Sequence, residues 1–195
     1  IMKRLLLILI LTLSFHSWAT ADDIKDFEIE GMSIGDSALD YFTVEQIIKR
    51  KKFYRNTDSK TFFKTEIISS KFKTYDNIML HFKENDPNYI IESISGAIFF
   101  SKSSINTVQN CIKRRNIIDQ QVSKLFNDIE REVIEDKIYA WDKSKKSKTH
   151  NIYYTFKEGH YAALSCYVFS KEFSGDSHLK VMVNSADLSD WINSL

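Results

Sequence analysis

The sequence predicts an α+β protein: an antiparallel sheet of five or six strands with a long amphipathic helix packed on one face. Two groups of strand-like segments alternate apolar and polar residues, and the connections within each group are as short as those of hairpins. One long stretch between the two groups has helical periodicity. We expect these elements to form a single domain over residues 22–195, preceded by a leader of residues 1–21.

The leader has the three-part layout of a bacterial secretory signal peptide. Lys3 and Arg4 give it a positive start, residues 5–13 are apolar, and residues 19–21 are the small residues that a signal peptidase recognises. The apolar run is shorter than the about 20 residues that span a bilayer. We therefore expect a periplasmic or secreted protein with no membrane span after cleavage.

The charge balance argues against one class of partner. Cleavage of the leader would leave 25 basic residues of the original 27, against 26 acidic residues, so the net charge would be −1. A near-neutral chain has no electrostatic attraction for nucleic acid, and we expect no nucleic-acid partner.

The first half of the domain is expected to hold two short helices and three strands. Residues 22–30 are polar and predict a loose lead-in, and residues 37–42 predict a helical turn. Thr43 and Gln46 have the spacing of a capping box and should open a second helix. Strands are predicted at residues 61–69, which are rich in β-branched and aromatic residues, at 76–83, which alternate, and at 89–101, with a bulge or bend at Gly96.

The long helix is predicted from Ser103 to Ile129, because apolar residues recur there at spacings of three and four. Cys111 lies on the same apolar stripe, whereas the basic run 113–115 is expected to reach solvent. Residues 130–141 are ambiguous. If they continued a helix, the acidic side chains of residues 128, 132 and 136 would share one solvated face.

The second half predicts a hairpin of residues 150–156 and 160–169 around Gly159, then a strand at 178–183 and a terminal helix. Five identities relate this hairpin to the earlier one, with residues 77–78 matching 151–152 and residues 82–84 matching 156–158. A duplicated helix-plus-β-meander unit is one interpretation of this similarity, and chance is the other.

Cys111 and Cys166 are the two cysteines of the chain. In an oxidising compartment an isolated pair indicates one disulfide, here between the long helix and the second hairpin. Two free buried thiols are the alternative. Cys166 could not act as a nucleophile in a disulfide, and as a free thiol it would need a basic neighbour that the sequence does not show.

We predict no catalytic, cofactor-binding or metal-binding residues and no cofactor. The four histidines outside the leader lie on or beside predicted strands, and none has metal-ligand spacing to another ligand, so each is interpreted as a surface or edge histidine: His81, His150, His160 and His178. Motifs for a nucleophilic serine or a phosphate loop are absent from the sequence.

Aromatic residues crowd the second hairpin on both of its faces. One face must pack on helices, and the other would leave tyrosines on an open sheet, where partners or ligands often bind. Tyr153, Tyr161 and Tyr167 are therefore a candidate partner-binding face. The alternative is that a helix or the 130–148 segment covers them.

Several short strings carry a resemblance to known proteins: Ile29 to Ser37, Tyr75-Asp76, Ile94-Ser95-Gly96, Cys111, Ser165-Cys166 and Trp191-Ile192. With these strings the chain resembles small uncharacterised exported proteins of marine alphaproteobacteria of the Pelagibacter type, a resemblance that implies no activity. Gly31-Met32-Ser33 before a short helix and a β-meander is similar to SmpA/OmlA lipoproteins and β-lactamase-inhibitor-like modules. This second likeness implies a binding module, although the lipoprotein cysteine is missing from this sequence.

Taken together, the sequence predicts an exported, non-catalytic module that binds an unknown protein or small ligand through its sheet face or hairpin loops. The alternative is a small periplasmic hydrolase whose site is assembled from scattered residues. A deep pocket with converging histidines and carboxylates would favour the enzyme, and a flat aromatic sheet face would favour the binding module.

Overall fold

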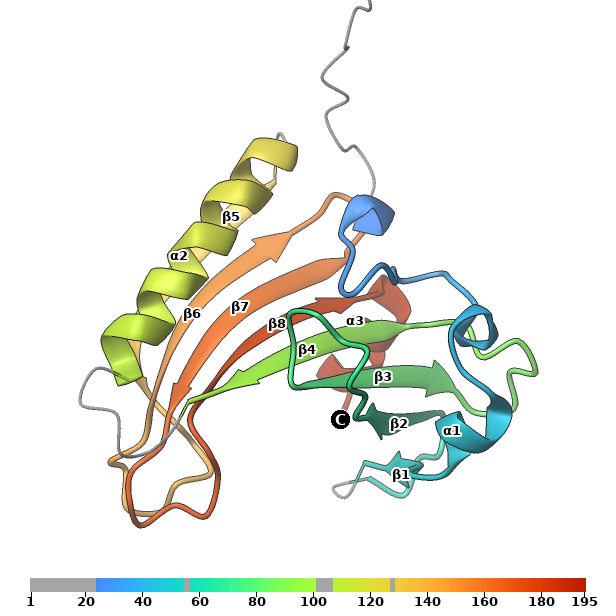
Figure 1. The fold of residues 1–195 in the computed structure, drawn as a ribbon, viewed down its shortest axis with the longest axis horizontal. Helices are drawn as coiled ribbons and strands as arrows, with labels where there is room; N and C mark the ends of the chain where they lie inside the picture. Colours follow the sequence, from blue (N-terminus) through green and yellow to red (C-terminus); the bar gives the residue numbers. More distant parts are fainter. Residues whose placement is uncertain (1–23, 55–56, 101–106, 127–128) are drawn as a thin grey trace, which may run out of the picture.

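A computed structural model describes residues 24–54, 57–100, 107–126 and 129–195 (Figure 1). The predicted signal peptide lies outside the described residues and stays a prediction.

The described residues form one antiparallel sheet of eight strands in the order β1-β2-β3-β4-β8-β7-β6-β5. Its centre is the pair β4–β8, which is in register from Ser93 opposite Asn184 to Phe99 opposite His178. The predicted hairpins are present as β3–β4 and β6–β7. The strands are β1 (Lys52–Phe53), β2 (Phe62–Ile67), β3 (Asn77–Lys83), β4 (Ser93–Phe99), β5 (Glu130–Ile138), β6 (Lys148–Thr155), β7 (Tyr161–Val168) and β8 (His178–Asn184).

The helices are α1 (Val44–Ile48), α2 (Thr107–Leu125) and α3 (Ala186–Asn193), with 3₁₀ turns at η1 (Ile24–Asp26) and η2 (Ala38–Asp40). The capping box of Thr43 and Gln46 opens α1 as predicted. The predicted fold is wrong in its proportions: the sheet has eight strands and not five or six, and α2 spans 19 residues. The chain is still α+β, with more sheet and less helix than predicted.

The strand β5 explains much of this error. It is the edge of the sheet, and eight of its nine residues are exposed, so the alternation that reveals a half-buried strand is missing from its sequence. The structure resolves the ambiguity of this stretch in favour of a strand, so Glu132 and Asp136 share no helical face; the strand shifts register between Ile134 and Lys137. Asp128 lies outside the described residues.

A repeat of a helix plus three strands, one of the two interpretations of the matched residues, does not describe the structure. Four strands follow α1 and four follow α2. The five matching residues align β3 with β6, but β3 neighbours the central strand β4, whereas β7 separates β6 from the central β8. The matched residues therefore occupy positions that are not equivalent in the sheet.

The helix α2 packs on one face of the sheet against β7 and β8, and we call this the helix face (Figure 1). The predicted disulfide joins it to the sheet: Cys111 on α2 is bonded to Cys166 on β7, with the Cα atoms 5.9 Å apart. A second tie is the buried Tyr154 of β6, whose hydroxyl donates to Asp119 of α2 over 2.5 Å. Both ties hold the helix over the second group of strands.

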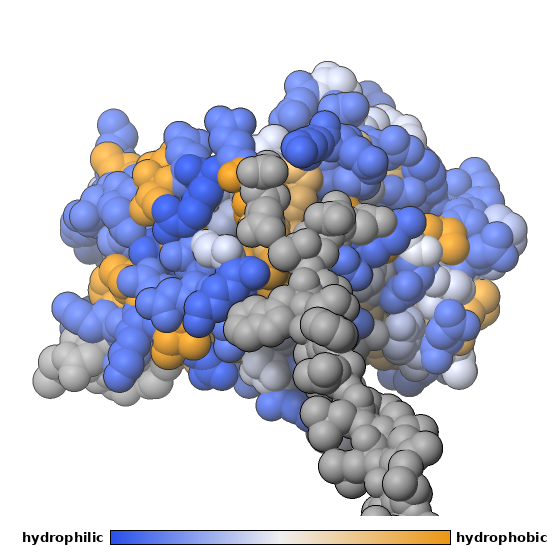
Figure 2. Space-filling view, turned by 90° about the horizontal axis from the view of Figure 1, so that it is seen from above, coloured by the Kyte–Doolittle hydropathy of each residue, from blue (hydrophilic) through white to orange (hydrophobic). Residues whose placement is uncertain are grey.

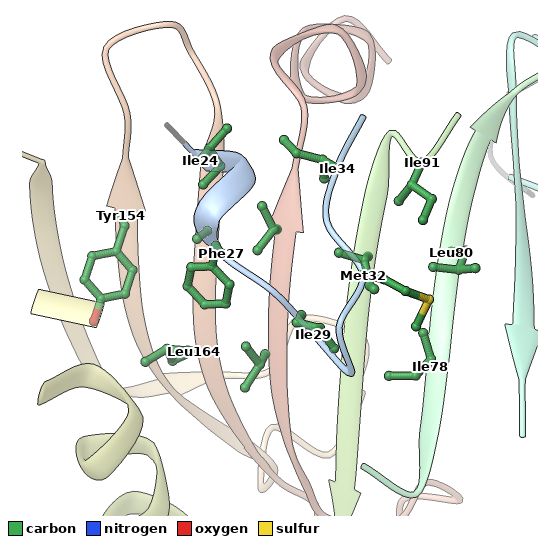
Figure 3. Close-up of a cluster of buried hydrophobic side chains, with 14 of the residues drawn as sticks. Ile24, Phe27, Ile29, Met32, Ile34, Ile78, Leu80, Ile91, Tyr154 and Leu164 are labelled. Carbon is green, nitrogen blue, oxygen red and sulfur yellow. The ribbon is translucent and has the colours of Figure 1, made fainter. Parts of the chain in front are cut away.

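Residues 24–34, which we call the N-terminal segment, lie beside α2 on the helix face and not as a loose lead-in (Figure 3). Five of its apolar side chains are buried on the sheet, across the strands from β7 to β3: Ile24, Phe27, Ile29, Met32 and Ile34. Glu30 and Gly31 form a tight turn in which both residues have positive φ, at 54° and 77°. The prediction from polarity failed here because the buried residues alternate with charged ones in a segment too short to show a period.

Gly96 lies in regular β3–β4 pairing opposite Ile78, so the predicted bulge is absent. The glycine is needed for another reason: a Cβ atom there would lie 2.4 Å from the ring of Tyr75. We expect Gly96→Ala to lower the free energy of unfolding by about 1–3 kcal/mol through overpacking, measured by urea denaturation. In a Tyr75→Ala background most of this cost should disappear. An equal cost in both backgrounds would show that the ring contact is not its source.

Candidate functional site

The face of the sheet opposite α2, which we call the open face, is only partly covered. The helix α3 crosses it, because Trp191 packs against Tyr54 and Phe62 with ring centroids 4.9 and 5.0 Å away. Strand alternation places Leu179, Val181 and Val183 of β8 on the helix face and the intervening residues, including Lys180 and Met182, on the open face. The open face is therefore the side on which polar side chains can meet a ligand.

A hollow of about 650 Å³ lies on the open face beside α3, and we call it the trough. Its volume falls in the range of small-molecule sites. Side chains of β2, β3 and β8 form its floor: Lys64, Met79, His81, Lys180 and Met182. Its walls include Tyr54, Tyr161 and, from α3, Ser189, Asp190 and Ile192.

The trough continues into a second hollow of about 1100 Å³, since the two share Tyr54, Lys64 and Met79. The second hollow reaches Tyr139 and the exposed Trp141 in the β5–β6 connection. The open face is thus hollowed over several strands and is not the flat aromatic surface that would mark a simple docking platform.

His81 is the most unusual group on the floor of the trough. Its side chain is buried, and its Nδ1 lies 3.1 Å from the hydroxyl of Tyr54, so it is not the surface histidine that the sequence predicts. Burial, reinforced by the charges of Lys180 and Lys64, lowers the pKa of His81 to about 3. The ring is therefore neutral near pH 7. When Tyr54 donates to Nδ1, the ring proton is on Nε2, which is buried and has no partner among the described residues.

Lys180 lies near His81 and is only partly exposed. Burial, together with the charge of Lys64, lowers the pKa of Lys180 to about 8. Within the described part of the chain, its ammonium group has no hydrogen bond or ion pair. The hydroxyl of Ser189, on the wall, is also buried without a partner among those residues. The trough thus holds polar groups whose hydrogen-bonding capacity the protein does not use.

The predicted tyrosine face is only partly assembled. All three tyrosines lie on the open face, and the rings of Tyr153 and Tyr161 are 5.6 Å apart. Tyr167 instead stacks on His178 and is covered by Tyr139, with centroid distances of 4.7 and 5.8 Å. Tyr161 alone of the three lines the trough.

Other sequence interpretations need correction on the helix face. His150 is buried and lies 2.9 Å from a carboxylate oxygen of Glu135, so it is not a surface histidine. Arg115, expected in solvent, is 2% exposed and donates to the same carboxylate. It follows Cys111 by one helical turn and so faces the sheet. Arg115 and His150 together lower the pKa of Glu135, and the three side chains form a mutually satisfied cluster.

A separate groove of about 530 Å³ lies on the helix face between α2 and the N-terminal segment. It is lined mainly by apolar side chains, such as Phe27, Ile118 and Val122. Figure 2 shows the molecule from above as a mainly hydrophilic surface on which hydrophobic residues form separate small groups.

The described residues include no group of three or more His, Cys, Asp or Glu side chains placed to hold a metal ion. Among the helices of the described chain, none is long and apolar enough to cross a membrane. No protein-family model matches the sequence, and neither the curated proteins nor the solved structures contain a similar chain. The resemblances drawn from short strings of residues therefore stay expectations.

The low pKa of His81 predicts acid sensitivity. His81 is protonated below about pH 6.5 in the unfolded chain but only near pH 3 in the folded protein. The free energy of unfolding therefore falls as the pH is lowered from 6.5 toward 3. Between pH 7 and pH 5 the wild type should lose about 1–2 kcal/mol more than His81→Gln, measured by urea denaturation at each pH. Identical pH profiles for wild type and His81→Gln would contradict this account.

Proposed function

We propose that this chain is an exported, non-catalytic binding module that holds a small ligand with an apolar body in the trough. The observation that carries the proposal is the combination of a sizeable hollow with buried polar atoms that lack partners among the described residues, His81 Nε2 and Ser189 Oγ. A native protein satisfies nearly all of its buried polar groups, and those left over in a hollow are suited to a ligand.

The chemistry of the trough favours binding over hydrolysis. A hydrolytic histidine needs a partner that orients it and a nucleophile or water within reach. His81 is paired with a tyrosine hydroxyl, not with a carboxylate, and its lowered pKa makes it a weak base. The export of the protein is supported by the leader-like sequence and by the disulfide, which is typical of oxidising compartments.

The proposal can be tested with N-phenyl-1-naphthylamine, a neutral apolar probe whose fluorescence rises on binding. We expect the folded protein to bind it and Ser189→Phe, which fills the wall of the trough, to weaken binding at least about tenfold. Ser123→Phe places the same bulk on an exposed position of α2 and is the matched control.

The unfolding midpoint of each variant shows whether it has folded, and Asn193→Trp at the rim of the trough provides a second blocking variant. Equal probe affinity in the blocking and control variants, or no binding by the folded wild type, would refute the proposal. Turnover of ester or amide substrates that is lost in His81→Gln would favour the hydrolase instead.

A further inference from the structure

We infer that the ligand of the trough is a small organic anion, with its charged group facing Lys180 and Lys64 and its apolar body on the surrounding aromatic and methionine side chains. This inference rests on the function proposed above and specifies the chemical class of the ligand.

The charged side chains of the trough favour an anionic ligand. Lys64 on β2 and Lys180 on β8 both lie on its floor, close enough for each to act on His81. Asp190 is the acidic residue among the lining side chains, and it is exposed on α3. Two ammonium groups that share a poorly solvated hollow repel each other, and an anion placed beside them relieves both the repulsion and the lost hydration.

An acidic side chain of strand β2, Glu66, is held away from Lys180 by other partners. Glu66, on the same face of β2 as Lys64, lines the neighbouring hollow and not the trough. Its carboxylate is bound by Arg50 at 3.2 Å and by the side-chain amide of Asn77 at 2.6 Å. Neither Glu66 nor Asp190 forms an ion pair with Lys180 in the described part of the chain.

Hydrogen-bond donors complete the anion site. With Tyr54 donating to its Nδ1, His81 offers an N–H at Nε2, and Ser189 offers a hydroxyl. Both groups line the trough together with the lysines. Neutral donors beside ammonium groups are the usual surroundings of a bound carboxylate or phosphate, since such charge-assisted hydrogen bonds are strong.

The remaining lining specifies the rest of the ligand. Met79 and Met182 are partly exposed on the floor, and Tyr54, Tyr161 and Ile192 stand around it. Methionine adapts to irregular apolar shapes, and tyrosine rings provide flat contact surfaces. A purely inorganic anion would leave these surfaces wet, so the lining favours an anion that carries an aliphatic or aromatic body.

The test compares two probes of similar apolar body: 8-anilinonaphthalene-1-sulfonate, which is an anion, and neutral N-phenyl-1-naphthylamine. We expect Lys180→Met to weaken binding of the anionic probe about tenfold and to change binding of the neutral probe less than about twofold. Lys124→Met, the same substitution on the exposed surface of α2, should alter neither affinity. Lys180→Arg keeps the charge and should retain most of the affinity for the anion.

Displacement of the anionic probe then defines the charged group. Octanoate and octyl phosphate should both displace the anionic probe, and the stronger competitor identifies the preferred anionic group. Octanol, the neutral control, should displace it at least about tenfold more weakly. The anion inference is wrong if Lys180→Met does not change binding of the anionic probe, or if octanol competes as well as the anions. If the neutral probe still binds in the trough, the proposed binding function is unaffected by that result. If neither probe binds the folded protein, the proposed function itself fails.

Discussion

Breaking the Cys111–Cys166 disulfide is expected to lower the free energy of unfolding by about 4 kcal/mol. The bonded residues are 55 positions apart, and the chain-entropy model gives this value for a loop of that length. The loop contains most of α2 together with β5 and β6. Without the bond, this long loop would gain much more conformational entropy on unfolding, and the helix would be held on the sheet less firmly. Urea denaturation with and without reductant measures the loss.

The double variant Cys111→Ala/Cys166→Ala is the control for this prediction. It should unfold at the same urea concentration as the reduced wild type and should not respond to reductant. An unfolding midpoint that is identical in the oxidised and reduced wild type would show that the bond contributes no stability.

The second large effect is expected at the N-terminal segment. Met32 is 1% exposed and packs with Ile78 and Leu80 of β3 in the core of the helix face (Figure 3). We expect Met32→Ala to lower the free energy of unfolding by about 3 kcal/mol, because it removes buried methylene groups and leaves a cavity. Urea denaturation measures the loss, and the slope of the transition shows whether unfolding remains a single step.

The chain contains a matched control for this substitution. Met79 is in the same sheet but on the open face, where it is partly exposed in the trough. Met79→Ala should therefore cost clearly less than Met32→Ala. Equal losses, or a larger loss at Met79, would mean that the N-terminal segment is not an integral part of the core.

The disulfide shows what sequence can predict about this fold. Helical periodicity places Cys111 on an apolar stripe, and strand alternation places Cys166 with Ala162 and Leu164, so local patterns alone direct both cysteines toward the core. The two hairpins are predictable for a similar reason, since turn residues separate runs of strand-forming residues. These signals are local and can be recognised in a single sequence.

The errors concern elements whose structure depends on their surroundings. The edge strand β5 has no buried face to reveal it, and the N-terminal segment is ordered by the sheet on which it lies. Arg115 interrupts the apolar stripe of α2, yet it is buried because its guanidinium group donates to Glu135 of β5. Such partners come from distant parts of the chain, so periodicity alone could not predict them.

The candidate site escapes sequence reasoning for the same reason. The alternation of β8 indicates that Lys180 and Met182 share a face, and that signal is present in the sequence. Lys64 and His81 lie near Lys180 because only β4 separates β3 from β8 in the sheet, and β2 lies next to β3. That order of strands cannot be deduced from local patterns, so His81 resembles a surface residue when only its neighbours in the sequence are considered.

The most direct test of the central claim uses the methionines as reporters. Of the four in the sequence, Met79 and Met182 line the trough, Met32 lies in the core of the helix face, and Met2 belongs to the predicted leader. With ¹³C-methyl methionine labelling, titration with N-phenyl-1-naphthylamine should shift the methyl signals of Met79 and Met182 and leave that of Met32 in place. A shift at Met32 without shifts at Met79 and Met182 would contradict the assignment of the trough as the binding site.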